Sequence, residues 1–352
     1  MIADIAIRER VGIAPELADA FVRAAIGGIS IAGYPSALQW QVIGQIASHV
    51  FGIEIDPATV EALEAGAACE LITAPAMRRR LVQAIVTLEL LEDPIPPELA
   101  NHVRRFARTL HVSEPMVHAA RSAACGHLAV MYADIQRNSY YTQEARHLIV
   151  NGHLWRILRS RFAYRDLVAS RAIERKWAAL ADMPVGSLGQ AVAEFYRVHH
   201  FPVPGARRGI GEIGAQHDFV HVLANYPPDP DGEINVFAFS AAAMDDPKGF
   251  VQMVMTLGLF QNSTITRVAG KQVAIARSGT MEEPGAAARF GDALHRGTVC
   301  KVDALGMDHF AIAVEPLAAL RDRFGISPRE DTSRPGALDA LDPPVPPPTS
   351  AS

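Results

Sequence analysis

Residues 217–233 read HDFVHVLANYPPDPDGE and contain the most specific structural signals of the chain. His217 and His221 are four residues apart, a spacing that places both imidazoles on one face of a helix. The prolines and Gly232 that follow should end this helix and turn the chain back before Glu233. The segment therefore predicts two neighbouring helices with two nitrogens and one carboxylate between them. Such a donor set suits zinc or a similar divalent metal.

Asp218 is the fourth candidate ligand of this segment, and its role is open. It lies ~100° around a helix from His217. It therefore binds the metal only if the local geometry bends or if the metal lies between two helix faces. Otherwise its carboxylate would orient an imidazole. The other histidines of this half are interpreted as surface or core residues; they include His199, His200, His295 and His309.

Upstream of this segment, the chain predicts one helix after another. The expected helices are one capped by Ser36, one starting at Asp56-Pro57, and others over 77–91, 96–110 and 115–132. We therefore expect an all-α fold with two helical domains. The first is a helical bundle over residues 1–135, and the second is a metal-binding domain over residues 183–326.

Two segments of different composition flank the second domain. Residues 136–182 are rich in arginine and contain Trp155 and Trp177. They are most simply an exposed helical linker, although such a segment could also rest on anionic headgroups or on a partner. Residues 327–352 are rich in proline, serine, threonine, aspartate and alanine, which predicts a disordered tail.

Composition excludes several classes of protein. The 352 residues have a formal net charge of −5 and no run of basic residues, so we expect no nucleic-acid partner. The three cysteines are far apart in the sequence, as in a reduced cytoplasmic protein. The first residues lack the basic and apolar regions of a signal peptide, and no apolar run approaches the ~20 residues of a membrane-spanning helix.

Residues 183–326 resemble the coenzyme Q (ubiquinone) biosynthesis protein 4 family. Four features carry the resemblance: the turn Pro184-Val185-Gly186-Ser187-Leu188-Gly189, the aromatic pair in Glu194-Phe195-Tyr196, the motif His217-Asp218-x-x-His221-x11-Glu233, and the final helix Pro316–Ile326. The match covers about two-fifths of the chain. The N-terminal helices are similar to the TerB-like modules linked to tellurite resistance, without the acidic metal-binding residues that some of those modules carry.

The resemblance implies a function. The metal ligands and catalytic residues would be His217, Asp218, His221 and Glu233, with zinc as the expected metal. The reaction would remove the C1 carboxylate of a polyprenylated hydroxybenzoate, with or without hydroxylation at that carbon, so the chain would be a lyase of ubiquinone biosynthesis. The expected partners are the quinone precursor, other proteins of that pathway and a second copy of the chain. The expected location is cytoplasmic, at the surface of the inner membrane.

An apolar segment downstream offers a place for the isoprenoid tail. Residues 250–260 are nearly uncharged and include Met253, Met255, Leu257 and Phe260. Flexible methionines suit an irregular hydrocarbon chain. The same residues are most simply an ordinary helical core, and a groove wall can belong to both.

Two alternatives to a decarboxylase remain. In the first, the protein is a non-catalytic lipid-binding organiser of a quinone-biosynthesis complex, and its metal is structural. Four protein ligands would complete a tetrahedral zinc site and favour this alternative, whereas three ligands and an open position would favour catalysis. In the second, the protein is a metal hydrolase that acts on another substrate.

Overall fold

The structure is a computed structural model that describes residues 17–139, 170–244, 247–269 and 278–341. The regular secondary structure of these residues is helical, apart from one isolated β-bridge between Ser187 and Pro316. The predicted all-α fold is confirmed. Among the described residues, no helix has the length and apolar character needed to cross a membrane.

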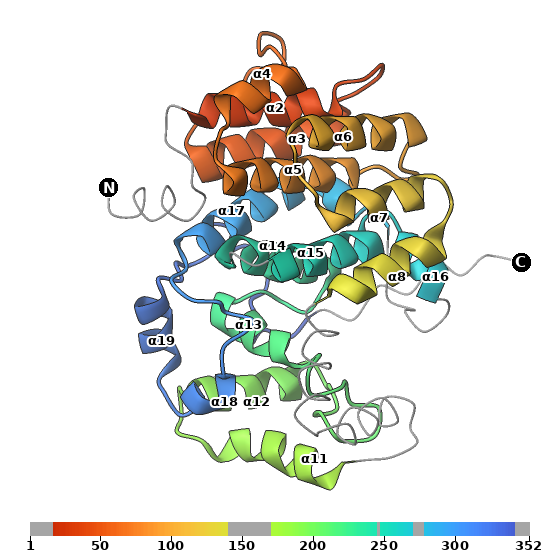
Figure 1. Cartoon of the computed structure of the whole chain (residues 1–352). Helices are drawn as coiled ribbons and strands as arrows, with labels where there is room; N and C mark the ends of the chain where they lie inside the picture. The colour runs from red at the N-terminus through yellow and green to blue at the C-terminus, as the bar shows by residue number, and fades with distance from the viewer. Residues whose placement is uncertain (1–16, 140–169, 245–246, 270–277, 342–352) are drawn as a thin grey trace, which may run out of the picture.

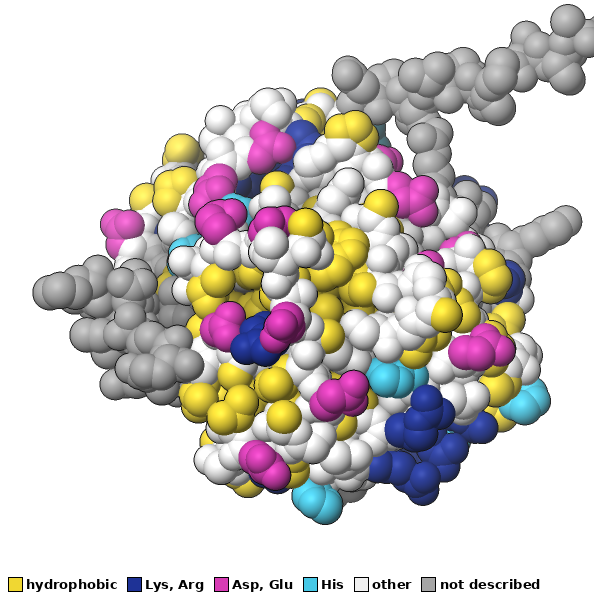
Figure 2. All heavy atoms as spheres, turned by 90° about the horizontal axis from the view of Figure 1, so that it is seen from above, with side chains coloured by type: hydrophobic (Ala, Val, Ile, Leu, Met, Phe, Trp, Pro, Cys, Tyr) yellow, Lys and Arg dark blue, Asp and Glu magenta, His cyan; other side chains and the backbone are white. Residues whose placement is uncertain are grey.

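The N-terminal half supplies the upper layers of Figure 1. Its helices are α2 (Ala18–Ile29), α3 (Ala37–Ile46), α4 (Ala65–Leu71), α5 (Pro75–Glu89), α6 (Pro97–Thr109), α7 (Pro115–Ala124) and α8 (Leu128–Asn138), with a π-helical turn over Ala47–Phe51. Seen from above, hydrophobic side chains gather in the middle of this face, interrupted by small groups of charged side chains (Figure 2).

Two expected helix starts in this half have different outcomes. Ser36 does cap α3, because its hydroxyl accepts from Gln39 N while the Gln39 side chain accepts from Ser36 N. The helix expected at Asp56 is wrong. The Asp56 carboxylate instead accepts from Ala58 N within a turn, and the next helix begins only at Ala65. An aspartate before proline satisfies the donors of a turn as well as those of a helix start.

The helix expected over 115–132 is interrupted. It begins at Pro115, but α7 ends at Ala124 and α8 starts at Leu128. Gly126 adopts a φ of 75° between them, a left-handed conformation that ends a helix at low cost for glycine.

The C-terminal half supplies the central and lower layers of Figure 1. Its elements are α11 (Arg171–Ala178), a 3₁₀ turn (Ala179–Asp182), α12 (Leu188–Val198), α13 (Gln216–Ala224), α14 (Pro230–Ala243), α15 (Pro247–Phe260), α16 (Thr264–Ala269), a 3₁₀ turn (Thr280–Glu282), α17 (Ala286–Val299), α18 (His309–Ile312) and α19 (Leu317–Phe324). In Figure 1, the helices α14, α15 and α17 lie between α2 to α6 above and α12 and α13 below, with α8 beside α15 and α16.

The two halves pack closely on each other. Helix α17 lies against α3 and against the π-helical turn. Gly291 permits this approach, since a Cβ at that position would lie only 2.6 Å from the His49 ring. One continuous group of buried apolar side chains runs through both halves. The division into two domains stays a prediction.

The two flanking segments differ in part from expectation. Residues 140–169 of the expected linker, with Trp155, lie outside the described residues. Trp177 is buried rather than exposed, and its ring lies 5.4 Å from that of Phe219. The expected disorder of the tail is wrong for residues 327–341, which pack on the C-terminal half. Ala337 is fully buried, and its backbone N donates to Asn225. Residues 342–352 lie outside the described residues.

Glu89, at the end of α5, is a buried carboxyl group that gives rise to a prediction about pH. It is 1% exposed, and neither of its oxygens has a hydrogen-bond partner among the described residues. Burial raises its pKa from 4.5 to about 8. The folded protein therefore keeps a proton that the unfolded chain loses, so the free energy of unfolding should fall as pH rises from about 4.5 to about 8.

Replacing Glu89 with glutamine should remove this pH dependence and raise the free energy of unfolding at pH 7 by about 3 kcal/mol. Urea unfolding at several pH values measures both effects. Glu70, which is exposed on α4, provides the control, because Glu70→Gln should change neither quantity. An unchanged pH profile in Glu89→Gln would show that Glu89 is not the group responsible.

Candidate metal centre

Helices α13 and α14 form the helix–turn–helix predicted from residues 217–233. Asn225 ends α13 in the left-handed conformation, with a φ of 62°. Asp229 caps α14, because its carboxylate accepts from Gly232 N at 2.7 Å. Gly232 allows the tight turn, since a Cβ there would lie 1.9 Å from Pro227 O. The turn brings the start of α14 beside the buried histidines of α13.

The four predicted ligands come together at this turn. His217 Nε2 lies 3.3 Å from Asp218 Oδ1 and 3.6 Å from Glu233 Oε2. His221 Nε2 lies 3.3 Å from Glu233 Oε1. One donor atom each from His217, Asp218 and His221 lies within 4.8 Å of the other two. We call these four residues the metal cluster.

Backbone carbonyls fix the orientation of both imidazoles. His217 Nδ1 donates to Gly214 O at 2.6 Å, and His221 Nδ1 donates to Tyr226 O at 3.0 Å. Because a carbonyl oxygen only accepts, each Nδ1 carries a proton and Nε2 faces the cluster. The buried His221 Nε2 has no hydrogen bond to any described residue, although a Glu233 oxygen is near. An unsatisfied buried nitrogen of this kind fits a metal ligand.

Aromatic rings hold the imidazoles in place from the sides. Phe237 of α14 stacks on His217 with ring centroids 5.5 Å apart, and Phe195 of α12 stacks on His221 at 5.6 Å. Phe195 is fully buried and Phe237 is 3% exposed. The cluster thus lies in an apolar surrounding, in which electrostatic interactions are strong.

The structure places Asp218 within the cluster, beside His217. One carboxylate oxygen is directed at the cluster, and the other accepts a hydrogen bond from the hydroxyl of Tyr196. Burial and the Asp218 carboxylate raise the pKa of Tyr196 above its usual value, so the hydroxyl keeps its proton and donates. Asp218 is therefore oriented by Tyr196 and still offers one oxygen to a cation.

The charges in the cluster favour a cation. Burial opposes ionisation of Glu233, but the imidazoles of His221 and His217 outweigh it and hold the pKa of Glu233 well below its usual value. Burial likewise opposes charge on His217, yet Asp218 and Glu233 together raise its pKa to about 10. Burial raises the pKa of Asp218. The two carboxylates thus stabilise a positive charge between them. In this structure a proton on His217 supplies that charge, and a bound metal ion would supply it instead.

The donor set fits a zinc-type ion. Two nitrogens and two carboxylates from two adjacent helices are within its usual ligand choice, and the imidazoles have the carbonyl partners that metal-binding histidines use. The structure thus brings together all four residues that the sequence predicted.

The remaining predicted residues lie elsewhere. Both ring nitrogens of His309 are hydrogen-bonded, to Gln216 and to Ala304 O, so it is a satisfied core histidine. His199 bonds to Ala337 O. Of the four residues expected to contact an isoprenoid tail, Met253 is buried and lines a mainly apolar cavity of about 100 Å³ between the two halves of the chain. Leu257 is fully buried in the core, and Met255 and Phe260 are half-buried beside it.

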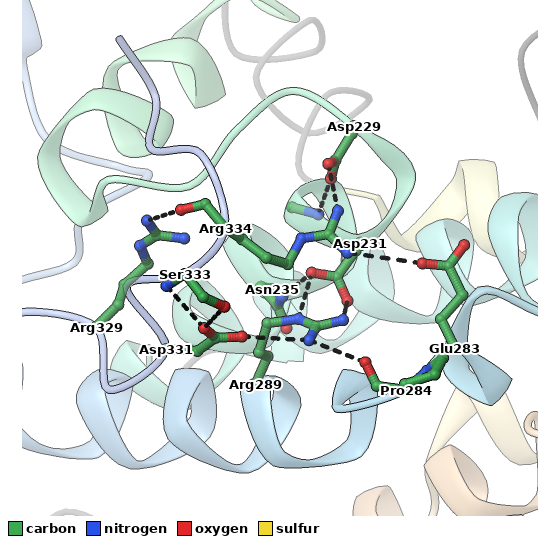
Figure 3. Close-up of polar contacts among 11 residues, drawn as sticks. Asp229, Asp231, Asn235, Glu283, Pro284, Arg289, Arg329, Asp331, Ser333 and Arg334 are labelled. Carbon is green, nitrogen blue, oxygen red and sulfur yellow. Dashed lines mark hydrogen bonds and ion pairs between the residues drawn. The ribbon is translucent and has the colours of Figure 1, made fainter. Parts of the chain in front are cut away.

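A network of charged side chains holds the first turn of α14 (Figure 3). Arg289 of α17 donates to both carboxylate oxygens of Asp231, at 2.9 and 3.0 Å, and to Asp331 at 3.4 Å. Arg334 donates to Asp229 at 2.7 Å. The network ties Asp231 of α14, two residues before Glu233, to α17 and to residues 331–334.

Tyr196 is the residue whose role sequence reasoning missed, and it supports a prediction. Replacing Tyr196 with phenylalanine should leave Asp218 unanchored and weaken zinc binding by about 10–100-fold. Competition with a zinc chelator would measure the change. Tyr132→Phe, a half-buried position on α8, should have no effect. Equal zinc affinity in wild type and Tyr196→Phe would mean that this hydrogen bond does not support the site.

Comparison of the chain with protein-family models, with curated proteins and with solved structures finds no match. The features of the chain that bear on its function are therefore the geometry of the metal cluster and the motif spacing within residues 183–326.

Proposed function

We propose that this chain is a metal-dependent lyase of ubiquinone biosynthesis. It removes the C1 carboxylate from the head group of a polyprenylated hydroxybenzoate. The observation that carries the proposal is His221 Nε2, a buried nitrogen with no hydrogen bond to the described residues, next to a second imidazole and two carboxylates. The spacing of these residues is that of the family which residues 183–326 resemble.

A divalent cation bound by the cluster would stabilise the negative charge that develops as carbon dioxide leaves, and a proton from water then takes the place of the carboxylate at C1. The protein residues have separate tasks. Glu233 stays ionised at neutral pH because of its imidazole neighbours, so it acts as a ligand and not as a proton donor. Tyr196 holds Asp218 in place. Phe195 and Phe237 keep water from the sides of the imidazoles.

One observation favours the organiser with a structural metal as a second candidate. The cluster itself offers four side chains, which are enough to complete a tetrahedral zinc site without an open position. Under this proposal the protein would present quinone precursors to other proteins of the pathway. The hydrolase alternative has no comparable support. In either role the substrate has a membrane-embedded tail, so the protein would act peripherally at the membrane surface.

Mass analysis of the lipid tests the proposal. The purified full-length protein is stripped of metal and incubated with a polyprenylated hydroxybenzoate, with and without added zinc. Loss of carbon dioxide only when zinc is present would support the enzyme. Tight zinc binding that raises the thermal stability while the lipid stays unchanged would support the organiser. The absence of zinc binding would contradict both.

A further inference from the structure

We propose that Arg296 and Arg321 are positioning residues of the metal centre. Neither belongs to the metal cluster, but both hold the end of α13, the helix that carries three of the four cluster residues. This role rests on the proposed function in one respect, namely that the metal cluster binds a divalent ion. It assigns part of the affinity for that ion to two residues outside the sequence motif of the cluster.

The last turn of α13 has four backbone carbonyls that the helix itself cannot satisfy. Three of them belong to Val222, Leu223 and Ala224, which are fully buried. Buried carbonyls are out of contact with water, so each of them needs a donor from the protein. The fourth, His221 O, accepts from Tyr226 N at 3.0 Å. The end of this helix is therefore stable only if side chains from other elements donate to it.

Two arginines from two other helices supply these donors. Arg321 of α19 donates through Nε to Leu223 O at 2.9 Å and through Nη2 to Val222 O at 2.8 Å. Arg296 of α17 donates through Nη2 to Ala224 O at 2.8 Å. With these hydrogen bonds, all four carbonyls of the last turn of α13 have partners.

The positive charge of both arginines suits this position. Carbonyl oxygens at the C-terminal end of a helix carry a partial negative charge, to which the dipole of the helix adds. Arg296 is only 1% exposed, and burial together with the charge of Arg296 lowers the pKa of Arg321. The protein thus keeps two cations close together despite their repulsion, because both bind the negative end of α13.

Arg296 also contacts the residue that orients His221. The central carbon of its guanidinium lies over the ring of Tyr226, 4.9 Å from the ring centroid. Tyr226 is bound to His221 twice, because its backbone N donates to His221 O and its backbone O accepts from His221 Nδ1, both at 3.0 Å. The second bond keeps the proton on Nδ1 and leaves Nε2 for a metal ion. Movement of Tyr226 would therefore turn this nitrogen away from Glu233.

Zinc affinity of the full-length protein, measured by competition with a chelator, tests the proposal. Arg296→Met removes the donors and the charge but keeps an unbranched apolar side chain. It should raise the Kd for zinc by about 10–100-fold, the effect of losing a group that orients a ligand. Arg296→Lys keeps the charge and one donor group, so it should bind zinc more tightly than Arg296→Met. The visible absorption of Co²⁺ bound in place of zinc depends on the arrangement of the ligands and should change in Arg296→Met.

Two control variants separate positioning from a general loss of stability. Leu81 is fully buried on α5 in the N-terminal half, so Leu81→Ala leaves a space in the core and should lower the melting temperature. At temperatures at which the variant is folded, its Kd for zinc and its cobalt spectrum should match those of the wild type. Arg323 lies on the same helix as Arg321, but its side chain is 52% exposed. Arg323→Met should leave zinc binding unchanged, whereas Arg321→Met should weaken it.

The possible failures give different results. Wild-type zinc affinity in folded Arg296→Met and Arg321→Met would overturn the proposal, as would an equal loss of affinity in Leu81→Ala. If Arg296→Met does not fold, as judged by circular dichroism, Arg321→Met decides the test, because Arg321 is only half-buried. If the variants lose zinc affinity as expected but the wild type never decarboxylates the lipid, the positioning role stands and the proposed lyase activity fails. If the wild type binds no zinc, both proposals are wrong.

Discussion

Replacing His221 with alanine is expected to remove the bound metal and to abolish turnover of the head group. His221 is fully buried, and its Nε2 faces Glu233 at 3.3 Å. The change deletes one of the two nitrogen donors. Loss of a hydrogen-bond partner of a ligand lowers metal affinity by about 10–100-fold, and loss of the ligand itself should lower it by more. Metal content by mass spectrometry and lipid analysis after incubation measure the two effects.

His309→Ala is the matched control, because it removes an equally buried imidazole from the same half of the chain. Both variants should lose stability, but only His221→Ala should lose metal. If His221→Ala retained one metal ion per chain, His221 would not be a ligand. If it lost the metal yet still decarboxylated the lipid, the reaction would not need the metal.

A second large effect is expected at Arg289. Replacing Arg289 with alanine should lower the free energy of unfolding by about 3–5 kcal/mol, because it leaves the Asp231 carboxylate buried without its cation. Asp231 is 5% exposed and Arg289 is 8% exposed, so water cannot replace the lost partner. Denaturant unfolding measures the change.

Arg323 provides the control for this prediction. It also contacts both oxygens of a carboxylate, that of Glu315, at 2.7 and 3.0 Å, but the side chain of Arg323 is 52% exposed. Arg323→Ala should therefore lower the free energy of unfolding far less than Arg289→Ala does. A double change of Arg289 and Asp231 to alanine should recover part of the lost stability. Equal losses for Arg289→Ala and Arg323→Ala would contradict the role of burial.

The metal cluster could be predicted from the sequence because its signals are local. The spacing of His217 and His221 follows from helical periodicity, and the prolines before Glu233 mark the turn between two helices. The all-α fold was predictable for the same reason, since periodic apolar residues and caps such as Ser36 act over a few positions.

Features that depend on distant contacts could not be predicted. Tyr196 is 22 residues from Asp218, and nothing in its local sequence indicates this hydrogen bond. Residues 327–341 are held in place by polar groups elsewhere in the chain, such as Asn225 and Asp229. The composition of this segment, which is poor in apolar residues, gives no sign of these contacts. At Asp56, a turn and a helix start have the same local sequence signal, so the pattern could not separate them.

The hydrogen bonds of Arg334 and Ala337 also mean that different parts of the site form at different times during synthesis. Ala337 is held by Asn225 at the end of α13, and Arg334 by Asp229 at the start of α14. A ribosome makes residues 217–233 about a hundred residues before Ala337, and domains fold as the chain emerges. The helices of the metal cluster can therefore form early, but they receive these contacts only after about a hundred further residues have been made. Maturation of the site is thus linked to the synthesis of residues 334–337.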